Sequence, residues 1–228
     1  MALREVDLLD GSPAEGYPFD LAAVRGLPLD LSAPVTLLVG ENGSGKSTLV
    51  EAIAVAAGFN PEGGSGQVRF ETEATHSELS AHLRLSWSPR LRPGWFLRAE
   101  SFYNAASHRA SSASLGERSY HHMSHGESFL EVARTWFANP YFFVLDEPEA
   151  ALSFTGQLAL LHLLLDGVSA GGQFLVATHS PILMAVPGAR IYQLGASGVT
   201  EQSYEELEVL ALWRSFLESP ERFLRHLG

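Results

Sequence analysis

The sequence has no cysteine, few basic residues and no long uninterrupted apolar run. Without cysteine, the chain cannot form a disulfide, a thiolate metal site or a cysteine nucleophile. Lys and Arg number 15 against 26 Asp and Glu, a formal net charge of −11, so nonspecific binding of nucleic acid is not favoured. The richest apolar run, Leu158 to Leu165, is interrupted by His162, and the N-terminus is too acidic for a signal peptide. With 46% hydrophobic residues, we expect a folded cytoplasmic protein.

A strand, a glycine-rich loop and a helix follow one another near the N-terminus. The apolar run from Pro34 to Gly40 is typical of a strand buried on both faces of a parallel sheet. From Ser47 onward apolar residues recur at helical spacing until Gly58. The pattern therefore predicts strand, loop and helix in direct succession.

The loop between them carries a phosphate-binding pattern. Its eight residues, GENGSGKS, match G-x-x-x-x-G-K-[ST] at every fixed position. Glycines let backbone N–H groups surround phosphate oxygens, Lys46 reaches the β and γ phosphates from a solvent-facing loop, and the Ser47 hydroxyl ligates Mg²⁺. The predicted ligands are therefore ATP and Mg²⁺. The predicted nucleotide-binding residues are Gly40, Glu41, Asn42, Gly43, Ser44, Gly45, Lys46, Ser47 and Thr48.

A second apolar strand, Tyr141 to Leu145, ends in two acids, Asp146 and Glu147. Without other motifs, two acids after a strand occur more often in a turn than in a catalytic site. Beside a phosphate-binding loop, it supplies what phosphoryl transfer needs, one carboxylate for the metal and one to polarise water. We therefore predict Asp146 as an Mg²⁺ ligand and Glu147 as a catalytic residue.

The remaining segments predict one α/β domain over residues 1–228, with a mainly parallel sheet covered by helices on both faces. Capping-box spacing at Ser203 and Glu206, and Pro after Ser219, predict two packed closing helices. The other expected segments are an antiparallel β subregion at about 62–100 with strands at 67–70, 82–87 and 95–99, a lid segment at about 101–138 with a helix at 129–137, a helix at 155–166 stopped by Gly167, and a strand at 174–177.

The ordered set of motifs resembles an ABC-type P-loop ATPase. The set comprises the glycine loop, the sequence MSHGES at 123–128, the sequence FFVLDEP at 142–148, and His179 after a strand. The chain is most similar to a small stand-alone bacterial group called AAA family ATPases, whose second acidic motif reads DEPEAALS as at Asp146 to Ser153. The resemblance extends from about Tyr17 to Leu227 and implies an ABC-type P-loop NTPase fold with ATPase activity.

The resemblance also implies a site shared between two chains. In this family a signature loop contacts the γ-phosphate bound by the opposite subunit of a head-to-tail dimer. The corresponding residues here are Ser124, His125, Gly126 and Glu127, of which Ser124 and Gly126 match the transporter sequence LSGGQ. The alternative is a plain capping box, since Ser124 and Glu127 have S-x-x-E spacing before an apolar helix.

The resemblance also implies roles for three other parts of the sequence. His179 stands at the position of the switch histidine that touches the γ-phosphate and the attacking water. The segment from Ala150 to Ser153 matches the loop that crosses the dimer interface, with Ser where transporters usually have Asp. By its position after the strand at 95–99, Glu100 stands in for the family's Gln, which is absent here. Its carboxylate is a predicted Mg²⁺ ligand, with a purely structural role equally expected.

The sequence leaves the adenine-stacking residue open and does not favour a zinc site. Adenine stacking in the family uses an aromatic residue upstream of the glycine loop, and Tyr17 and Phe19 both lie there, with core packing equally expected for either. His121, His122 and His125 have H-H-x-x-H spacing, but they lie in a serine-rich segment and are better explained as loop residues than as a zinc site.

The expected function is ATP hydrolysis by an ATP-dependent homodimer that acts on an unidentified protein partner. One alternative is the ATP-binding subunit of a membrane transporter, which would contact a membrane subunit. A second is a DNA-repair or chromosome-associated clamp, although only 74 residues, 49–122, separate the loop from the signature, without coiled-coil heptads.

Overall fold

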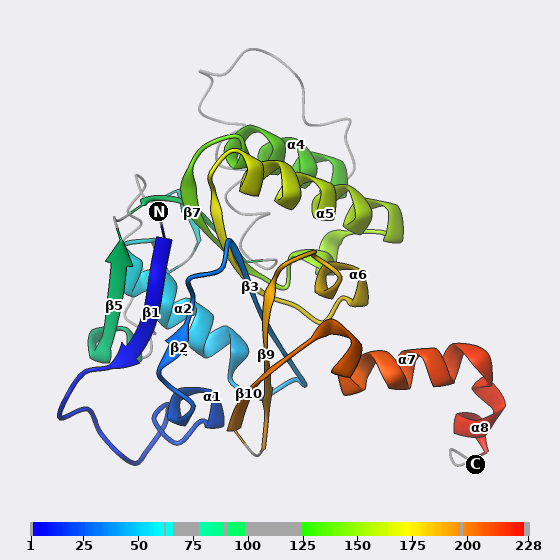
Figure 1. Ribbon diagram of the computed structural model, residues 1–228, viewed down its shortest axis with the longest axis horizontal. Coiled ribbons are helices and arrows are strands. Elements are labelled where there is room, and N and C mark those ends of the chain that lie inside the picture. The colour runs from blue at the N-terminus through cyan, green and yellow to red at the C-terminus, as the bar shows by residue number, and fades with distance from the viewer. Residues whose placement is uncertain are drawn as a thin grey trace.

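A computed structural model describes residues 2–61, 63–65, 78–88, 91–98, 125–196 and 198–225 (Figure 1). Helices cover both faces of a central sheet, and a smaller sheet packs over one of these helices, α2 (Lys46–Ala57). The other helices are α1 (Ala22–Arg25), α4 (His125–Phe137), α5 (Phe154–Ser169), α6 (Pro181–Met184), α7 (Glu208–Glu218) and α8 (Pro220–Leu224), with 3₁₀ turns η1 (Glu78–His82), η3 (Pro148–Ala151) and η4 (Tyr204–Glu206).

The central sheet is parallel in its middle and antiparallel at its two edges. Its order is β10-β9-β3-β8-β7-β6-β4, and only β10 and β4 run antiparallel to their neighbours among the described strands. The strands are β3 (Val35–Gly40), β4 (Gly64–Ser65), β6 (Arg92–Arg98), β7 (Tyr141–Asp146), β8 (Gln173–Ala177), β9 (Arg190–Gly195) and β10 (Gly198–Gln202). Consecutive residues of β3 pack into opposite cores, Leu37 into one and Leu38 into the other, which confirms a strand buried on both faces.

A three-stranded antiparallel sheet of order β2-β1-β5 lies on the other side of α2 (Figure 1). Its strands are β1 (Ala2–Leu8), β2 (Leu29–Asp30) and β5 (Leu83–Ser88). Apolar side chains of α2, including Leu49, Val50 and Ile53, form a single core with residues of both sheets. The helix after the glycine loop is therefore held from two sides, and its first turn is fixed with it.

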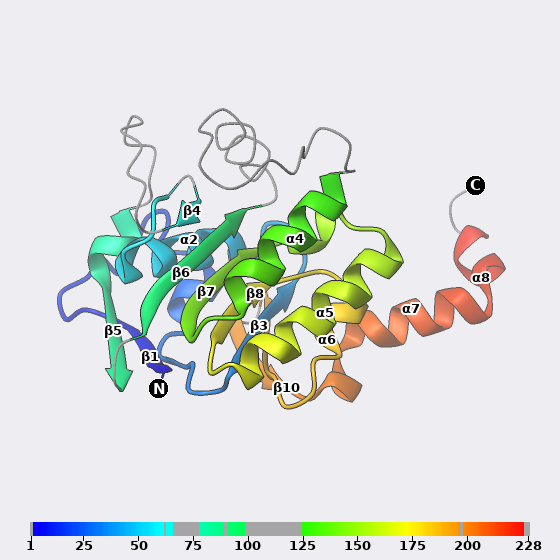
Figure 2. The ribbon, with the colours of Figure 1, turned by 90° about the horizontal axis from the view of Figure 1, so that it is seen from above.

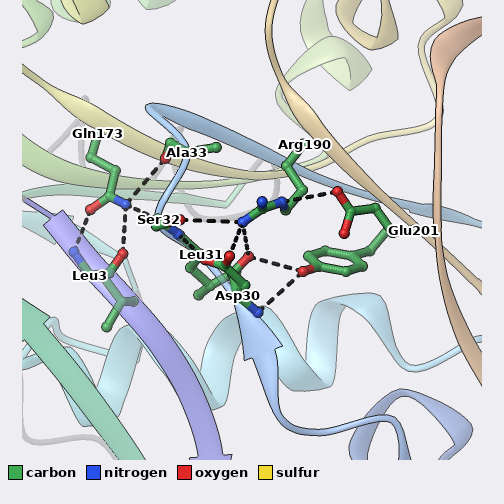
Figure 3. A network of polar contacts seen from close by, with 9 residues as sticks. Leu3, Asp30, Leu31, Ser32, Ala33, Gln173, Arg190 and Glu201 are labelled. Carbon is green, nitrogen blue, oxygen red and sulfur yellow. Dashed lines mark hydrogen bonds and ion pairs between the residues drawn. The ribbon is translucent and has the colours of Figure 1, made fainter.

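Two polar side chains, the buried Gln173 and the partly buried Arg190, join the sheets (Figure 3). Gln173, at the start of β8, accepts a hydrogen bond from the Leu3 N–H at 2.7 Å and donates to the carbonyls of Leu3 at 2.9 Å and Leu31 at 2.6 Å. Arg190 of β9 forms an ion pair of 2.5 Å with Asp30 of β2. These contacts fix the small sheet relative to the central sheet.

The opposite face of the central sheet is covered by α4, α5 and α6 (Figure 2). The prediction that Gly167 stops the helix at 155–166 is wrong, because α5 continues to Ser169 and the turn falls at Gly171, with φ 87°. Gly167 instead allows close packing, since a Cβ there would lie 2.5 Å from the Phe174 ring.

Strand β6 differs from the prediction of an antiparallel subregion over 62–100. β5 pairs antiparallel with β1, and β6 pairs antiparallel with β4, but β6 also pairs parallel with β7 and so belongs to the central sheet. The residues from Gly94 to Leu97 are all buried, which suits a strand covered on both faces. The expected strand at 67–70 lies outside the described residues.

The C-terminal helices extend away from the body of the molecule (Figure 2). The predicted capping box is present, since Glu206 accepts hydrogen bonds from the Ser203 N–H at 3.0 Å and hydroxyl at 2.8 Å. Leu207 and Leu210 are buried in the core and Val209 packs against it, whereas Trp213 and Leu217 are exposed. The expectation that both closing helices pack there is therefore wrong. The amphipathic spacing predicts a buried helix face, but the apolar positions continue along α7 beyond the body of the molecule.

Candidate nucleotide-binding site

The glycine loop lies at the carboxyl end of β3, where the topology gathers the ends of the neighbouring parallel strands β7 and β8. Gly40 has φ 154°, and a Cβ there would lie 2.3 Å from the Leu194 carbonyl oxygen. Gly45 adopts the left-handed conformation, with φ 91°, immediately before α2. Both glycines are therefore required by the path of the backbone, which leads directly into the N-terminus of α2.

Lys46 is the first residue of α2 and the only lysine in the sequence. Its ammonium group donates to the carbonyl oxygens of Gly40 and Glu41, each at 2.9 Å, and the residue is only 3% exposed. The prediction of a solvent-facing Lys46 is thus wrong, because the loop wraps around its side chain. Burial lowers the pKa of Lys46, and the charges of Glu147, Asp146 and Glu149 act in the opposite direction.

Ser47 and Asp146 meet across the first turn of α2 and the end of β7. The Ser47 hydroxyl donates to Asp146 Oδ1 at 3.1 Å. Burial raises the pKa of Asp146 to about 6, while the hydrogen bond from Ser47 and the charge of Arg98 lower it. A hydroxyl oxygen and a buried carboxylate oxygen are ligands that Mg²⁺ prefers, so the two residues predicted to hold the metal fit it chemically.

Glu147 and His179 face each other at the ends of β7 and β8. Glu147 is the only residue besides glycine with positive φ among those described, at φ 49° and ψ 51°. Its N–H donates to the Ala177 carbonyl at 2.9 Å, and its Oε1 lies 3.3 Å from His179 Nε2. The side chains are 40% and 35% exposed, so the pair borders the solvent rather than the core. Left-handed backbone conformation is uncommon in residues other than glycine. Where it occurs, it is often found at functional sites.

A pocket joins the glycine loop to Glu147 and to the segment before α1. It is lined by Tyr17, Leu21, Asn42, Gly43, Gly45, Lys46, Ser47, Thr48 and Glu147. Tyr17 is 74% exposed, and its hydroxyl lies 3.4 Å from Thr48 Oγ1. Phe19 is buried and packs edge-on against His82. The structure therefore separates the two aromatic candidates, with Tyr17 at the pocket and Phe19 in the core.

Comparisons with known proteins agree with this geometry. The family model described as an AAA domain matches residues 19–87. The cytochrome c biogenesis ATP-binding export protein CcmA of Rhodopseudomonas palustris is 31% identical over 170 residues, which cover 70% of this chain and 84% of CcmA. The chain belongs to the ABC-type P-loop ATPases. The ATPase therefore hydrolyses ATP to ADP and phosphate, as the sequence predicts.

A second relative matches over a smaller part of its length, and two solved structures share the fold. The zinc import ATP-binding protein ZnuC of Vibrio vulnificus is 30% identical over 152 residues, which are 64% of this chain and 57% of ZnuC. An ATP-binding cassette of an ABC transporter, MJ1267 in its ADP conformation, has a TM-score of 0.54 and 18% identity, covering 100% of this chain and 99% of that chain. The SMC head domain of Thermotoga maritima has a TM-score of 0.50 and 20% identity, covering 89% and 99%. These structures support the fold.

Two predicted site residues of the ATPase, Glu100 and Ser124, lie outside the described part of the chain. His121 and His122, which were predicted to be loop residues, also lie outside it. His125 begins α4, and Gly126 and Glu127 lie in its first turn, with Glu127 exposed. Within the described ranges, no group of three or more His, Cys, Asp or Glu side chains is arranged to hold a metal ion, and no helix is long and apolar enough to cross a bilayer.

Arg98 is a site residue that the sequence did not indicate. It ends β6, its Cα pairs with that of Asp146 in the sheet register, and its guanidinium forms an ion pair of 2.8 Å with Glu51 of α2. Its positive charge lowers the pKa of Asp146. No sequence motif includes Arg98, and the residue lies beside Asp146 because β6 pairs with β7.

The buried Asp146 carboxylate predicts an unusual effect on stability. Its pKa rises from 3.8 to about 6 in the folded chain, so the folded state binds more protons than the unfolded state between these values, and the free energy of unfolding falls as pH rises. Asp146→Asn retains an oxygen for Ser47 and removes the charge. Without nucleotide and with a chelator, we expect it to stabilise the chain at pH 7.5 by up to about 3 kcal/mol.

Thermal unfolding at pH 7.5 and near pH 4 measures this effect. The gain should shrink toward the lower pH, where the folded Asp146 is already protonated. Asp10→Asn, at an exposed position, controls for the loss of one negative charge. A variant no more stable than the wild type at pH 7.5 would contradict the prediction.

Proposed function

We propose that the ATPase forms an ATP-dependent homodimer, built from single-domain subunits, that couples hydrolysis to a protein partner. The observation that carries the proposal is the convergence of three pairs at one edge of the sheet: Lys46 with its loop, Ser47 with Asp146, and Glu147 with His179. One member of each pair, Lys46, Ser47 and Glu147, lines a single pocket, and His179 lies beside Glu147.

Each residue of the proposed site has a distinct task. Lys46 exchanges its bonds to backbone carbonyls for phosphate oxygens and neutralises their charge. Ser47 and Asp146 hold Mg²⁺, which stabilises charge on the phosphates when bound. Glu147 orients the attacking water and accepts its proton, and His179 contacts the γ-phosphate from the neighbouring strand. Attack of the water oxygen on the γ-phosphorus breaks the bond to the bridging oxygen and releases ADP.

The proposal extends to residues at the border of the site. The exposed Tyr17 ring beside Thr48 is the proposed face for adenine, since a planar base can stack on it at the mouth of the pocket. Glu100, two residues after Arg98, is a further proposed Mg²⁺ ligand in place of the family's Gln. The remaining nucleotide-binding residues are those of the glycine loop.

An exposed apolar pair on α5 supports the dimer. Phe154 and Leu158 are one helical turn apart, are 66% and 45% exposed, and directly follow the segment from Ala150 to Ser153 that the family places at the interface. Ser153 itself caps α5, because its hydroxyl accepts a hydrogen bond from the Gly156 N–H at 3.2 Å. We propose that this surface meets the partner subunit, whose Ser124, His125, Gly126 and Glu127 then approach the γ-phosphate.

Mixing two inactive variants tests the shared site. In a heterodimer of Ser124→Arg and Glu147→Gln chains, one site carries both lesions and the other carries neither, so ATPase activity should reappear. At 1:1 mixing about half of the dimers are mixed, and each holds one intact site, so recovery to roughly a quarter of the wild-type rate is the upper expectation if sites act independently.

The cap interpretation predicts a different result from the same experiment. If Ser124 only caps α4 in its own subunit, each chain keeps a complete lesion and mixing restores nothing. A pull-down with two different tags verifies that heterodimers form. Heterodimers without activity above the sum of the two variants would exclude the shared site.

The match to CcmA supports one second candidate, the ATP-binding subunit of a membrane transporter. The likeness to the SMC head supports the fold alone and gives the clamp alternative no further weight. Capture by Glu147→Gln chains held in the ATP state distinguishes a soluble protein from a membrane protein as the partner. Recovery of an integral membrane protein would replace the first proposal with the transporter.

A further inference from the structure

We infer that Glu149 is a positioning residue that holds His179 against Glu147; the inference rests on the roles proposed above for these two residues. Glu149 belongs to η3, two residues after Glu147. Its Oε1 accepts three hydrogen bonds, from the Thr178 hydroxyl at 2.8 Å, the His179 N–H at 2.5 Å and the Ser180 N–H at 3.0 Å. A single carboxylate oxygen thus gathers the donors of the segment that carries His179.

The rest of that segment is tied to other elements. The Thr178 N–H donates to the Leu38 carbonyl of β3 at 3.1 Å. Ser180 caps α6, and its hydroxyl donates to Gln157 of α5 at 2.6 Å. These bonds hold residues 178–180 in the fold but do not set their distance from Glu147. Among the described side chains in the turn that follows β7, only that of Glu149 forms hydrogen bonds to residues 178–180.

The length of the glutamate side chain and its hydrogen-bond acceptor oxygen both suit position 149. The segment is enclosed, since Thr178 and Ser180 are buried, so an unpaired backbone N–H within it would be costly. Glu149 Oε2 is buried and makes no hydrogen bond to any described residue, so only one of its oxygens is needed for the contact.

Variants of Glu149 distinguish a requirement for an oxygen atom at this position from a requirement for a negative charge. Glu149→Gln retains an oxygen at the same reach, and its turnover should stay within about threefold of the wild type. Glu149→Ala removes the oxygen, and Glu149→Asp keeps the charge but withdraws the oxygen by one methylene. For both we expect kcat to fall about 10- to 100-fold, as for a displaced catalytic group, with little change in KM because Glu149 does not line the pocket.

Amide hydrogen exchange without nucleotide gives a readout that is independent of activity. The N–H groups of His179 and Ser180 should exchange faster in the Ala and Asp variants and at the wild-type rate in the Gln variant. Glu205→Ala, at an exposed site on η4, controls for the loss of a carboxylate. If the Ala variant does not fold, the Asp and Gln variants decide. An Asp variant as active as the wild type would overturn the inference.

A double-mutant cycle identifies the residue through which Glu149 acts. In a His179→Ala background, Glu149→Ala should cost less than about twofold, because the side chain that it positions is already gone. Losses that multiply would show that Glu149 acts elsewhere and would overturn the inference. If His179→Ala alone leaves turnover unchanged, the proposed role of His179 fails first. If only the Glu149 variants remain active, the role of His179 stands and the inference alone is wrong.

Discussion

Lys46→Ala should weaken ATP binding about a hundredfold or more, the largest effect on affinity that we expect. The ammonium group is the only buried cation of the pocket lining, and it exchanges two backbone carbonyls for phosphate oxygens when nucleotide binds. A charge-assisted hydrogen bond contributes about 1.5 to 3 kcal/mol, and each 1.4 kcal/mol is a factor of ten in affinity. Calorimetric titration with Mg-ATP measures the change.

The buried position of Lys46 makes a folding control necessary. Circular dichroism and thermal unfolding of the nucleotide-free variant show whether the chain is intact. Arg214→Ala, at an exposed position on α7, controls for the loss of one positive charge. Because Lys46 is the only lysine, amine-directed labelling reports on this side chain and the α-amino group alone. Unchanged affinity in a folded variant, or labelling of Lys46 that ATP does not slow, would refute the nucleotide assignment.

Glu147→Gln should retain ATP and lose turnover by about 100-fold or more. The amide keeps the shape of Glu147 and its position 3.3 Å from His179, but it cannot accept a proton from water. A positioned general base usually contributes about 10² to 10⁴ in rate. ATP should therefore accumulate unhydrolysed, and light scattering should show a dimer that persists after ATP is added.

Single-turnover hydrolysis separates the chemical step from product release in this variant. Glu208→Gln, at an exposed position on α7, is the matched control and should hydrolyse ATP at the wild-type rate. If Glu147→Gln also hydrolyses at the wild-type rate, the water-polarising role belongs to another acid. Glu100 is then the next residue to test.

The regular part of the fold could be predicted from local patterns. The runs at 34–40 and 141–145 became β3 and β7, and helical spacing after Ser47 became α2, because strands buried on both faces and helices that cover them have distinctive apolar periods. Strands without a continuous buried run were harder to predict. Strands β1, β9 and β10 were not predicted, because their buried residues neither form an unbroken run nor alternate regularly with exposed ones.

The candidate site was predictable in its composition and less so in its geometry. The residues of the glycine loop, Asp146 and Glu147 follow from fixed spacing, since a phosphate-binding backbone needs glycines at set intervals and a metal needs a carboxylate at the end of a strand. The burial of Lys46 did not follow, because it depends on how the loop folds back over the side chain. Tyr17 and Phe19 could be separated only by their surroundings.

The sequence by itself therefore determined the family and the residues proposed for its chemistry: a phosphate loop, a carboxylate proposed to hold the metal and an acid proposed to polarise water, arranged in family order. The tertiary structure alone decided which groups meet across the ends of different strands. Arg98 lies beside Asp146 because β6 pairs with β7, and Glu149 reaches the segment of His179 because β7 pairs with β8. Local sequence encodes the chain's conformation over a few residues, whereas these contacts join positions 30 or more residues apart through sheet register.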